Sequence, residues 1–163
     1  MAFKRVPQKF TATVNEVTIG TGTSTSYTPG FYPYYKNTWF EAIYSADEIG
    51  QPGLITSLSL NYSTSYAYTC SDIRIYMGHR STSTHANSTD WTPLADLTLV
   101  YEGANMTIGA QSGWNQYELT NPFFYDGTDN LVVVFAKKAP NWSSSLTVYY
   151  TSMANTCLYR NSD

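Results

Sequence analysis

The stretch LITSLSLNY, residues 54–62, decides the fold class of this chain. Leu54, Leu58, Leu60 and Tyr62 are predicted to share one face of an extended backbone, while serine and asparagine side chains take the other face. This period of two predicts a β-strand with one buried face and one solvated face. No stretch of the sequence sustains the 3.6-residue period of an amphipathic helix.

Further strands are predicted on both sides of this stretch. Residues 130–136, NLVVVFA, are apolar almost throughout, which is typical of a central strand covered on both faces. In SDIRIYMG, residues 71–78, the isoleucines and Met77 are predicted to point inward, and Arg74 and Tyr76 outward. The other predicted strands lie in LTLVYEG (97–103), GWNQYELT (113–120), SLTVYYT (145–151) and TCLYR (156–160).

Turn-forming sequences separate the predicted strands at intervals of about 8–15 residues. Only SADEIG, residues 45–50, has the pattern of a short helical turn closed by glycine. The sequence therefore predicts an all-β fold, an antiparallel two-sheet β-sandwich with at most one short helical turn. Long connections at 20–38 and 78–93 favour Greek-key crossovers and hence a jelly roll. We expect one sandwich domain over residues 14–163, preceded by a basic N-terminal arm over residues 1–13.

The composition is rich in hydroxyl and aromatic groups and poor in charge. Charged residues make up 13% of the chain and the net charge is −3, which argues against binding to nucleic acid. Such a surface suits an extracellular or cell-surface protein, or alternatively a virion protein. No apolar stretch reaches the ~20 residues of a membrane span, and residues 1–10 lack the apolar run of a signal peptide. Cys70 and Cys157 are compatible with one disulfide or with two reduced thiols.

Five stretches of the chain, taken in order, resemble one kind of β-sandwich module. Such modules are appended to secreted and surface proteins of Bacteroidetes, occur in phages of these bacteria, and are related to the jelly-roll adhesin modules of gingipain-type proteases. The resemblance spans residues 14–162. The stretches are VTIGTGTSTSYTPGFYPYY (17–35), IYSADEIGQPGLITSLSLNY (43–62), IRIYMGHRSTST (73–84), DWTPLADLTLVYEG (90–103) and GWNQYELTNPFFYDGTDNLVVVFA (113–136).

The resemblance also has a consequence for the end of the sheet. Modules of this kind usually continue beyond a segment like CLYRNSD, residues 157–163, into a further strand. The resemblance therefore implies a sandwich that lacks its last strand. The open sheet edge is then expected to be completed by the N-terminal arm or by a neighbouring subunit.

The stretch SYTPGFYPYYKNTWF, residues 26–40, gathers seven aromatic side chains in what its prolines and glycine predict to be a loop. Exposed rings can stack on the apolar faces of sugars, and Tyr32, Tyr34 and Trp39 are the candidates for such contacts. The alternative is that rings of this stretch fill the open end of the sandwich. Trp142, in a polar loop between two strands, is a further ligand-binding candidate, whereas Trp91 and Trp114 are expected to pack against the sheets.

Motifs for metal binding and catalysis are sparse. Asp126, Asp129 and Asn130 could hold a structural calcium ion, although turn chemistry alone accounts for the sequence YDGTDN. His79 and His85 have no ligand spacing typical of zinc and are expected to be surface histidines. The chain has no G-x-S-x-G motif and no phosphate-binding loop, so we expect neither an enzyme nor a resident cofactor.

Together these features predict a non-catalytic extracellular recognition module of carbohydrate-binding or adhesin type. Its partner would be a glycan or a surface protein, held by loop aromatics. The alternative is a structural assembly protein, either a phage virion decoration or fibre component or an extracellular filament subunit. Such a protein would complete its sheet by strand addition from a neighbour.

Overall fold

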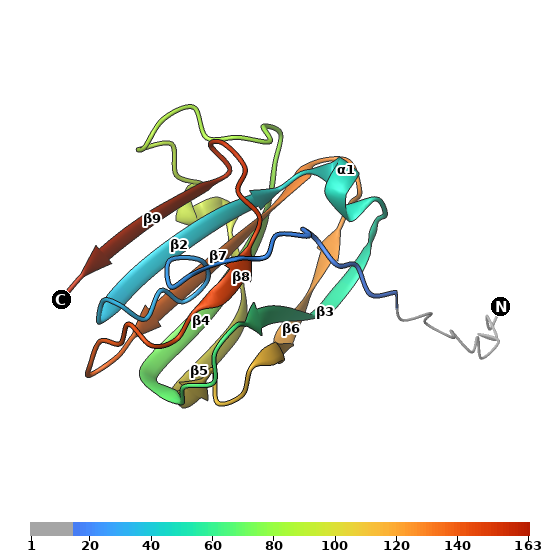
Figure 1. The fold of residues 1–163 in the computed structure, drawn as a ribbon. Helices are drawn as coiled ribbons and strands as arrows, with labels where there is room; N and C mark the ends of the chain where they lie inside the picture. The colour runs from blue at the N-terminus through green and yellow to red at the C-terminus, as the bar shows by residue number, and fades with distance from the viewer. Residues whose placement is uncertain (1–14) are drawn as a thin grey trace, which may run out of the picture.

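Two antiparallel β-sheets pack face to face in the computed structural model, which describes residues 15–163 (Figure 1). One sheet has the strand order β1-β8-β3-β6, and the other has the order β5-β4-β7-β2-β9. The strands are β1 (Ser24–Ser26), β2 (Asn37–Tyr44), β3 (Gly53–Tyr62), β4 (Tyr68–Arg80), β5 (Thr98–Ile108), β6 (Gly113–Tyr125), β7 (Asn130–Lys138), β8 (Val148–Tyr150) and β9 (Cys157–Ser162).

The strand pairing is that of a jelly roll. Strand β1 pairs with β8, β2 with β7, β3 with β6 and β4 with β5, so the first half of the chain folds back on the second. Strand β9 adds to the outer edge of β2. The predicted all-β sandwich is confirmed, while the predicted basic arm, residues 1–13, lies outside the described residues.

The core lies between the two sheets. Ile73, Ile75 and Met77 of β4 are fully buried there, as the alternation of that strand predicts. Strand β7 is covered on both faces, because Val133 packs in the core while Val132 and Val134 belong to a second cluster with Ile43 on the outer face. The second cluster shows that another segment of the chain also covers part of the outer side of the five-stranded sheet.

The predicted face of β3 is wrong at Leu54. Leu58, Leu60 and Tyr62 point toward the core as predicted, but Leu54 is 60% exposed. The pairing with β6 is irregular between Ile55 and Ser57, where β3 advances by two residues and β6 by five, and the alternation of β3 changes its phase there. Ile55 takes the inward position in place of Leu54.

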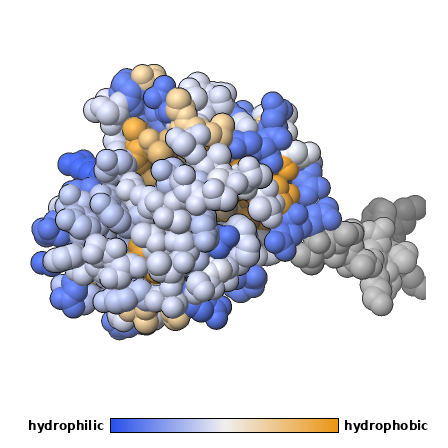
Figure 2. Space-filling model, viewed as in Figure 1, coloured by the Kyte–Doolittle hydropathy of each residue, from blue (hydrophilic) through white to orange (hydrophobic). Residues whose placement is uncertain are grey.

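Within residues 15–163, helical structure is limited to two short turns. The predicted turn is α1 (Ala46–Ile49), which begins with a capping box between Ser45 and Glu48 and ends at Gly50 in the left-handed conformation. A 3-10 turn, η1 (Leu94–Asp96), was not predicted. Within residues 15–163 the structure has no helix with the length and apolarity needed to cross a membrane. The face shown in Figure 2 is mostly pale, with small hydrophobic areas, as expected of a surface rich in hydroxyl groups.

Candidate functional site

An open groove of about 450 Å³ lies on the outer face of the five-stranded sheet, the face turned away from the core. Strand register brings its lining together from four strands. Asp72 of β4, Lys138 of β7, Asn37 of β2 and Ser162 of β9 form one row across the sheet. These positions share one face, because residues in paired register on antiparallel strands point to the same side.

A second row carries the aromatic floor of the groove. Arg74, Ala136, Trp39 and Arg160 lie side by side in this row, two residues further along each strand. Ala136 has the smallest side chain of the row and leaves space beside the half-buried indole of Trp39. The ring of Tyr76 lies 5.4 Å from that indole between ring centroids, at an interplanar angle of 36°.

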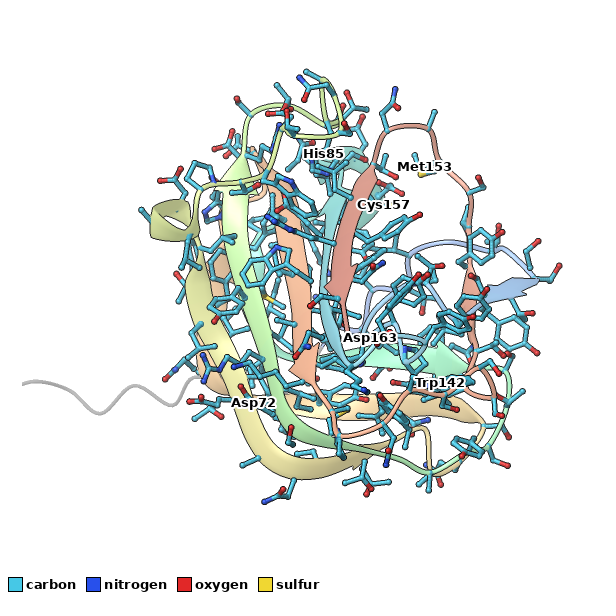
Figure 3. All side chains as sticks on the ribbon, turned by 90° about the vertical axis from the view of Figure 1, so that its left-hand side faces the viewer. Asp72, His85, Trp142, Met153, Cys157 and Asp163 are labelled. Atoms are coloured by element: carbon cyan, nitrogen blue, oxygen red, sulfur yellow. The ribbon has the colours of Figure 1, made fainter. Side chains whose placement is uncertain are left out.

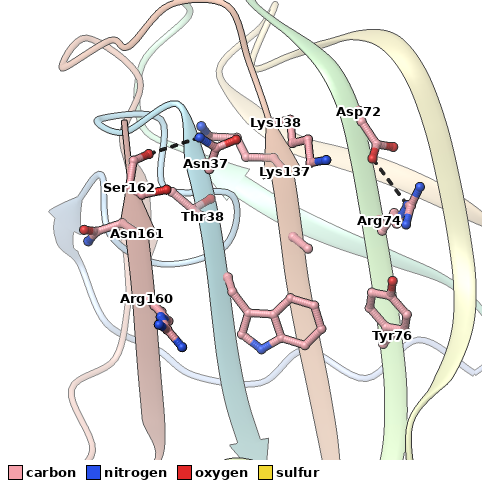
Figure 4. Close-up of a pocket in the computed structure, with 12 residues that line it drawn as sticks. Asn37, Thr38, Asp72, Arg74, Tyr76, Lys137, Lys138, Arg160, Asn161 and Ser162 are labelled. Atoms are coloured by element: carbon pink, nitrogen blue, oxygen red, sulfur yellow. Dashed lines mark hydrogen bonds and ion pairs between the residues drawn. The ribbon is translucent and has the colours of Figure 1, made fainter. Parts of the chain in front are cut away.

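The groove therefore offers an aromatic surface bordered by hydrogen-bonding groups on both sides. Figure 4 shows Asp72, Arg74 and Tyr76 along β4 on one side and Arg160 on the other. The side-chain amide of Asn37 donates to the carbonyl of Ser162 at 3.4 Å, which fixes one end of the row. An arrangement of this kind can stack a flat apolar face and hydrogen-bond its polar rim.

The charges of the groove are not all compensated. Arg74 lies 2.9 Å from Glu102 and 3.3 Å from Asp72, the latter contact without hydrogen-bond geometry. A hydrogen bond to Tyr76 and these two carboxylates raise the pKa of Arg74. Lys138 and Arg160 are exposed and form no ion pair with any residue of 15–163.

The connection between β4 and β5, residues 81–97, covers the outer face of the sheet beside the groove and is named here the wall. Leu97 packs there on the cluster of Ile43, Val132 and Val134. The connection approaches β4 so closely that a Cβ at Gly78 would lie 2.6 Å from the carbonyl oxygen of Asp96. Only glycine fits under the connection at this position.

A buried carboxylate fastens this wall to the sheet. Glu41 of β2 is 0% exposed, and its Oε1 accepts hydrogen bonds from the hydroxyl of Thr92 at 2.7 Å and from its backbone N–H at 3.1 Å. Arg80 and His85 lie 3.9 Å and 4.0 Å from the same oxygen. The guanidinium of Arg80 also donates to Asp90, so the wall is held by a connected polar cluster.

His85 corrects the prediction of a surface histidine. It is 4% exposed, its Nδ1 lies 2.9 Å from the carbonyl oxygen of Asp90, and its backbone N–H donates to Asn155. His79 is half-exposed and packs on Phe123 with 5.0 Å between ring centroids. Figure 3 shows His85 and Asp72 near opposite ends of the sheet, so the histidine lies away from the polar row of the groove.

A second hollow of about 360 Å³ continues the groove toward this wall. Trp39, Trp91, Thr92, Leu94 and Arg160 line it. Trp39 and Arg160 also line the first hollow, so the two hollows meet at these side chains. Trp91 was expected to pack against a sheet, and it is half-buried while still facing this second hollow.

Tyr27, Tyr34 and Trp142 form a separate exposed surface, named here the aromatic patch. The rings of Tyr27 and Tyr34 stack at 5.2 Å, and Tyr34 lies 5.7 Å from Trp142. Their exposed fractions are 36%, 39% and 57%. The structure thus brings together two of the predicted ligand-binding residues, Tyr34 and Trp142, and places Trp39 on a different surface.

Tyr32, one of the candidates for ligand contacts, is buried rather than exposed. It is only 7% exposed, because the rings of Tyr27, Tyr35 and Tyr159 surround it at centroid distances of 5.4 to 5.7 Å. The neighbouring Phe31 is 2% exposed and belongs to the core. Part of the 26–40 stretch therefore closes the sandwich, which was the alternative interpretation of that stretch.

Lys137 and Tyr68 join the two loops that carry the aromatic patch. The ammonium group of Lys137 donates to the carbonyl oxygens of Tyr35 and Lys36, and the hydroxyl of Tyr68 donates to that of Asn141. Burial lowers the pKa of Lys137 to about 8. Burial likewise raises the pKa of the Tyr68 hydroxyl, so this hydroxyl stays protonated and able to donate.

Two of the three calcium candidates, Asp126 and Asn130, have side chains that hydrogen-bond to the backbone. Oδ1 of Asp126 accepts hydrogen bonds from the N–H groups of Thr128 and Asp129, which lower the pKa of Asp126. The side chain of Asn130 instead bonds to the backbone of Ala46 and Arg80. Among residues 15–163 there is no group of three or more His, Cys, Asp or Glu side chains placed to hold a metal ion.

The two cysteines do not pair. Cys70 is buried and Cys157 is exposed, and both are free thiols. The register places Cys157 in the row of Ala42, Val133 and Met77, with two strands between β9 and β4. Cys70 lies seven residues earlier on β4 than Met77, a separation of about 23 Å along the strand, which is far beyond the reach of a disulfide.

Three of the residues that define the groove, Arg74, Lys138 and Arg160, were not among the predicted site residues. The outward direction of Arg74 was predicted, but the strand register that joins the three was not available from the sequence. Trp114, expected to pack, is 54% exposed.

No family model, curated protein or solved structure matches this chain, so the resemblance to surface modules of Bacteroidetes stays a prediction from the sequence.

Proposed function

We propose that this chain is a non-catalytic recognition module that binds a glycan in the groove over Trp39. The observation that carries the proposal is the row of Arg74, Ala136, Trp39 and Arg160, which sets an accessible indole between hydrogen-bonding side chains. A pyranose ring has an apolar face that stacks on an indole and a rim of hydroxyls that need hydrogen-bond partners.

The shape and length of the groove support a chain of sugars as the ligand. Two hollows meet at Trp39 and Arg160, and the second hollow brings a further indole, that of Trp91. Stacking and a few hydrogen bonds in an open groove are expected to give a Kd of roughly 10–100 μM. Weak binding of this order is typical of modules that act in several copies on a surface.

The carboxylates near the groove support binding rather than hydrolysis. Asp72 is engaged by Arg74 at the edge of the groove. Glu41 is fully buried and is occupied by hydrogen bonds from Thr92. A glycosidase needs two carboxyl groups that face each other across the substrate, and these two carboxylates already serve structural contacts.

Calorimetric titration with a panel of neutral and acidic oligosaccharides tests this proposal. Trp39→Ala is expected to weaken binding at least about tenfold, and Tyr76→Ala is expected to weaken it less, because Tyr76 only borders the indole. Trp114→Ala is the matched control, since it removes an exposed indole from the other sheet. Unchanged affinity in Trp39→Ala with a folded circular dichroism spectrum, or silence of the whole panel, would refute the proposal.

The aromatic patch gives the same titration a second purpose. Tyr34 and Trp142 were predicted as ligand-binding residues and are exposed side by side. If binding is lost in Trp142→Ala and kept in Trp39→Ala, the glycan binds at the aromatic patch and the groove proposal is wrong.

A specific observation also favours assembly as a second candidate function. Strand β9 pairs with β2 on one side only, and no strand of residues 15–163 pairs with its other side. A free edge of this kind can accept a strand from a neighbouring subunit in a virion or a filament. Light scattering over a wide concentration range tests this role. Oligomers that dissociate in Tyr159→Lys, which adds charge to the edge, support it, and a constant monomer mass contradicts it.

A further inference from the structure

The groove concentrates positive charge on a chain whose net charge is −3. Among residues 15–163, the cations that line it are Arg74, Lys138, Arg160 and the buried Lys137, whereas Asp72 is the only carboxylate in its lining. The charge of Arg74 is balanced by Asp72 and Glu102. Lys138 and Arg160 are left without a partner among the described residues.

These two side chains lie on opposite sides of the aromatic floor. Arg160 of β9 is directly opposite Trp39, so their Cα atoms are about 5 Å apart. Lys138 of β7 lies two residues beyond Ala136, the partner of Trp39 on that side, so its Cα is about 8 Å from that of Trp39. Both side chains are long enough to reach a group bound above the indole.

We infer that the groove selects acidic glycans, with Arg160 and Lys138 contacting carboxylate or sulfate groups of a sugar stacked on Trp39. This inference rests on the proposed glycan-binding function and names its ligand class. A guanidinium fork can bind a carboxylate or sulfate through two parallel hydrogen bonds, and an ammonium group acts as a point charge. A neutral sugar would not require two unpaired cations beside the stacking surface, because amide or hydroxyl side chains would hydrogen-bond it equally well.

The charge pattern does not fit a nucleic acid equally well. Binding to a phosphate backbone requires several cations in a row, because each phosphate contact contributes through the counterions it releases. The groove has two free cations on an otherwise acidic chain, which matches a ligand with one charge per sugar or per pair of sugars.

A matched pair of ligands separates charge from shape. The oligosaccharide of galacturonic acid and its fully methyl-esterified form have the same sugar rings, but only the acid carries carboxylates. We expect the acid to bind about tenfold more tightly at low salt, because two exposed ion pairs each contribute modestly, and we expect added salt to reduce the difference. A sulfated galactan oligosaccharide and its desulfated form provide the corresponding pair for sulfate.

Substitutions then assign the effect to the two cations. Arg160→Gln and Lys138→Gln are each expected to reduce the preference for the acid about threefold while leaving the binding of the neutral ester unchanged. Lys36→Gln is the control, because Lys36 is a cation that does not line the groove.

Each outcome has a defined meaning. Equal, Trp39-dependent binding of the acidic and neutral forms overturns the acidic preference and leaves the proposed glycan binding intact. A preference for the acid that survives in the Arg160→Gln, Lys138→Gln double variant also overturns the inference. If neither pair of ligands binds, the inference is refuted, and the proposed function is refuted as well only if the whole oligosaccharide panel is silent.

Discussion

Replacing Glu41 by glutamine tests whether a buried carboxylate holds the wall beside the groove. Glu41 is enclosed between the sheet and residues 81–97, and it accepts hydrogen bonds from both the hydroxyl and the N–H of Thr92. Glutamine has nearly the same size, so the substitution removes charge without creating a cavity. Its amide keeps one acceptor and places an NH₂ group among donors from Thr92 and Arg80.

The expected loss of stability follows from these contacts. A hydrogen bond to a charged group contributes about 1.5–3 kcal/mol and one to a neutral group about 1 kcal/mol. Glu41 has two such bonds, and Arg80 at 3.9 Å loses its buried counter-charge. We therefore expect the free energy of unfolding to fall by about 2–4 kcal/mol, equivalent to a decrease in Tm of about 4–16 °C for a chain of this size.

Urea denaturation at pH 7, followed by circular dichroism, measures this change. Glu118→Gln is the control, because Glu118 is exposed on β6 and its substitution should alter stability by less than about 0.5 kcal/mol. We also expect Glu41→Gln to change the fluorescence of the adjacent wall residue Trp91 at urea concentrations below those of global unfolding. A loss of stability below about 0.5 kcal/mol for Glu41→Gln would show that the wall does not depend on this carboxylate.

Two further predictions concern the thiols and the alkaline stability. One thiol, that of the exposed Cys157, should react quickly with a maleimide in the folded protein, and the buried Cys70 should react only after unfolding; a fast reaction of both thiols would contradict the structure. Burial raises the pKa of Cys70 to about 12 from 9.0, and that of Tyr117 to about 12 from 10.0. The folded state therefore keeps protons that the unfolded chain releases, and the free energy of unfolding should fall above pH 10. Lys137, with its pKa lowered to about 8 from 10.5, acts in the opposite sense between these values, so it offsets the effect of Cys70 between pH 9 and 10 and the fall should begin only above about pH 10. A steady decline of the free energy of unfolding from pH 8 would refute this balance.

The sequence predicted the sandwich well because most strands alternate strictly or are apolar on both faces. Strand β4 buries its predicted residues, and β7 is covered on both sides as its run of valines implies. The error arises where the alternation of a strand changes its phase. Leu54 is exposed beyond the irregular pairing between Ile55 and Ser57, and nothing in the local sequence indicates an irregularity at this point.

The site was predicted only in part. Trp39 was assigned to a loop because prolines and glycine precede it, yet it lies in β2, whose residues Trp39, Glu41 and Ile43 alternate with the core residues Phe40 and Ala42. Extending the test for a period of two beyond the prolines would have identified this strand. The partners of Trp39 in the groove come from three other strands, and such long-range register is not encoded by any local pattern.

The outer face of the five-stranded sheet has a covered half and an open half, and the outward side chains of β7 differ between the two halves. Its outward side chains are Val132 and Val134 beneath the wall, then Ala136 and Lys138 in the groove. Glu41 pairs with Val134 and therefore lies at the boundary. If the wall moved away, this carboxylate would lose its donors while apolar side chains became exposed, so both the desolvation of the charge and the hydrophobic cluster oppose that motion. The second hollow beneath the wall is thus preformed, and the proposed ligand would bind there without the cost of ordering a loop.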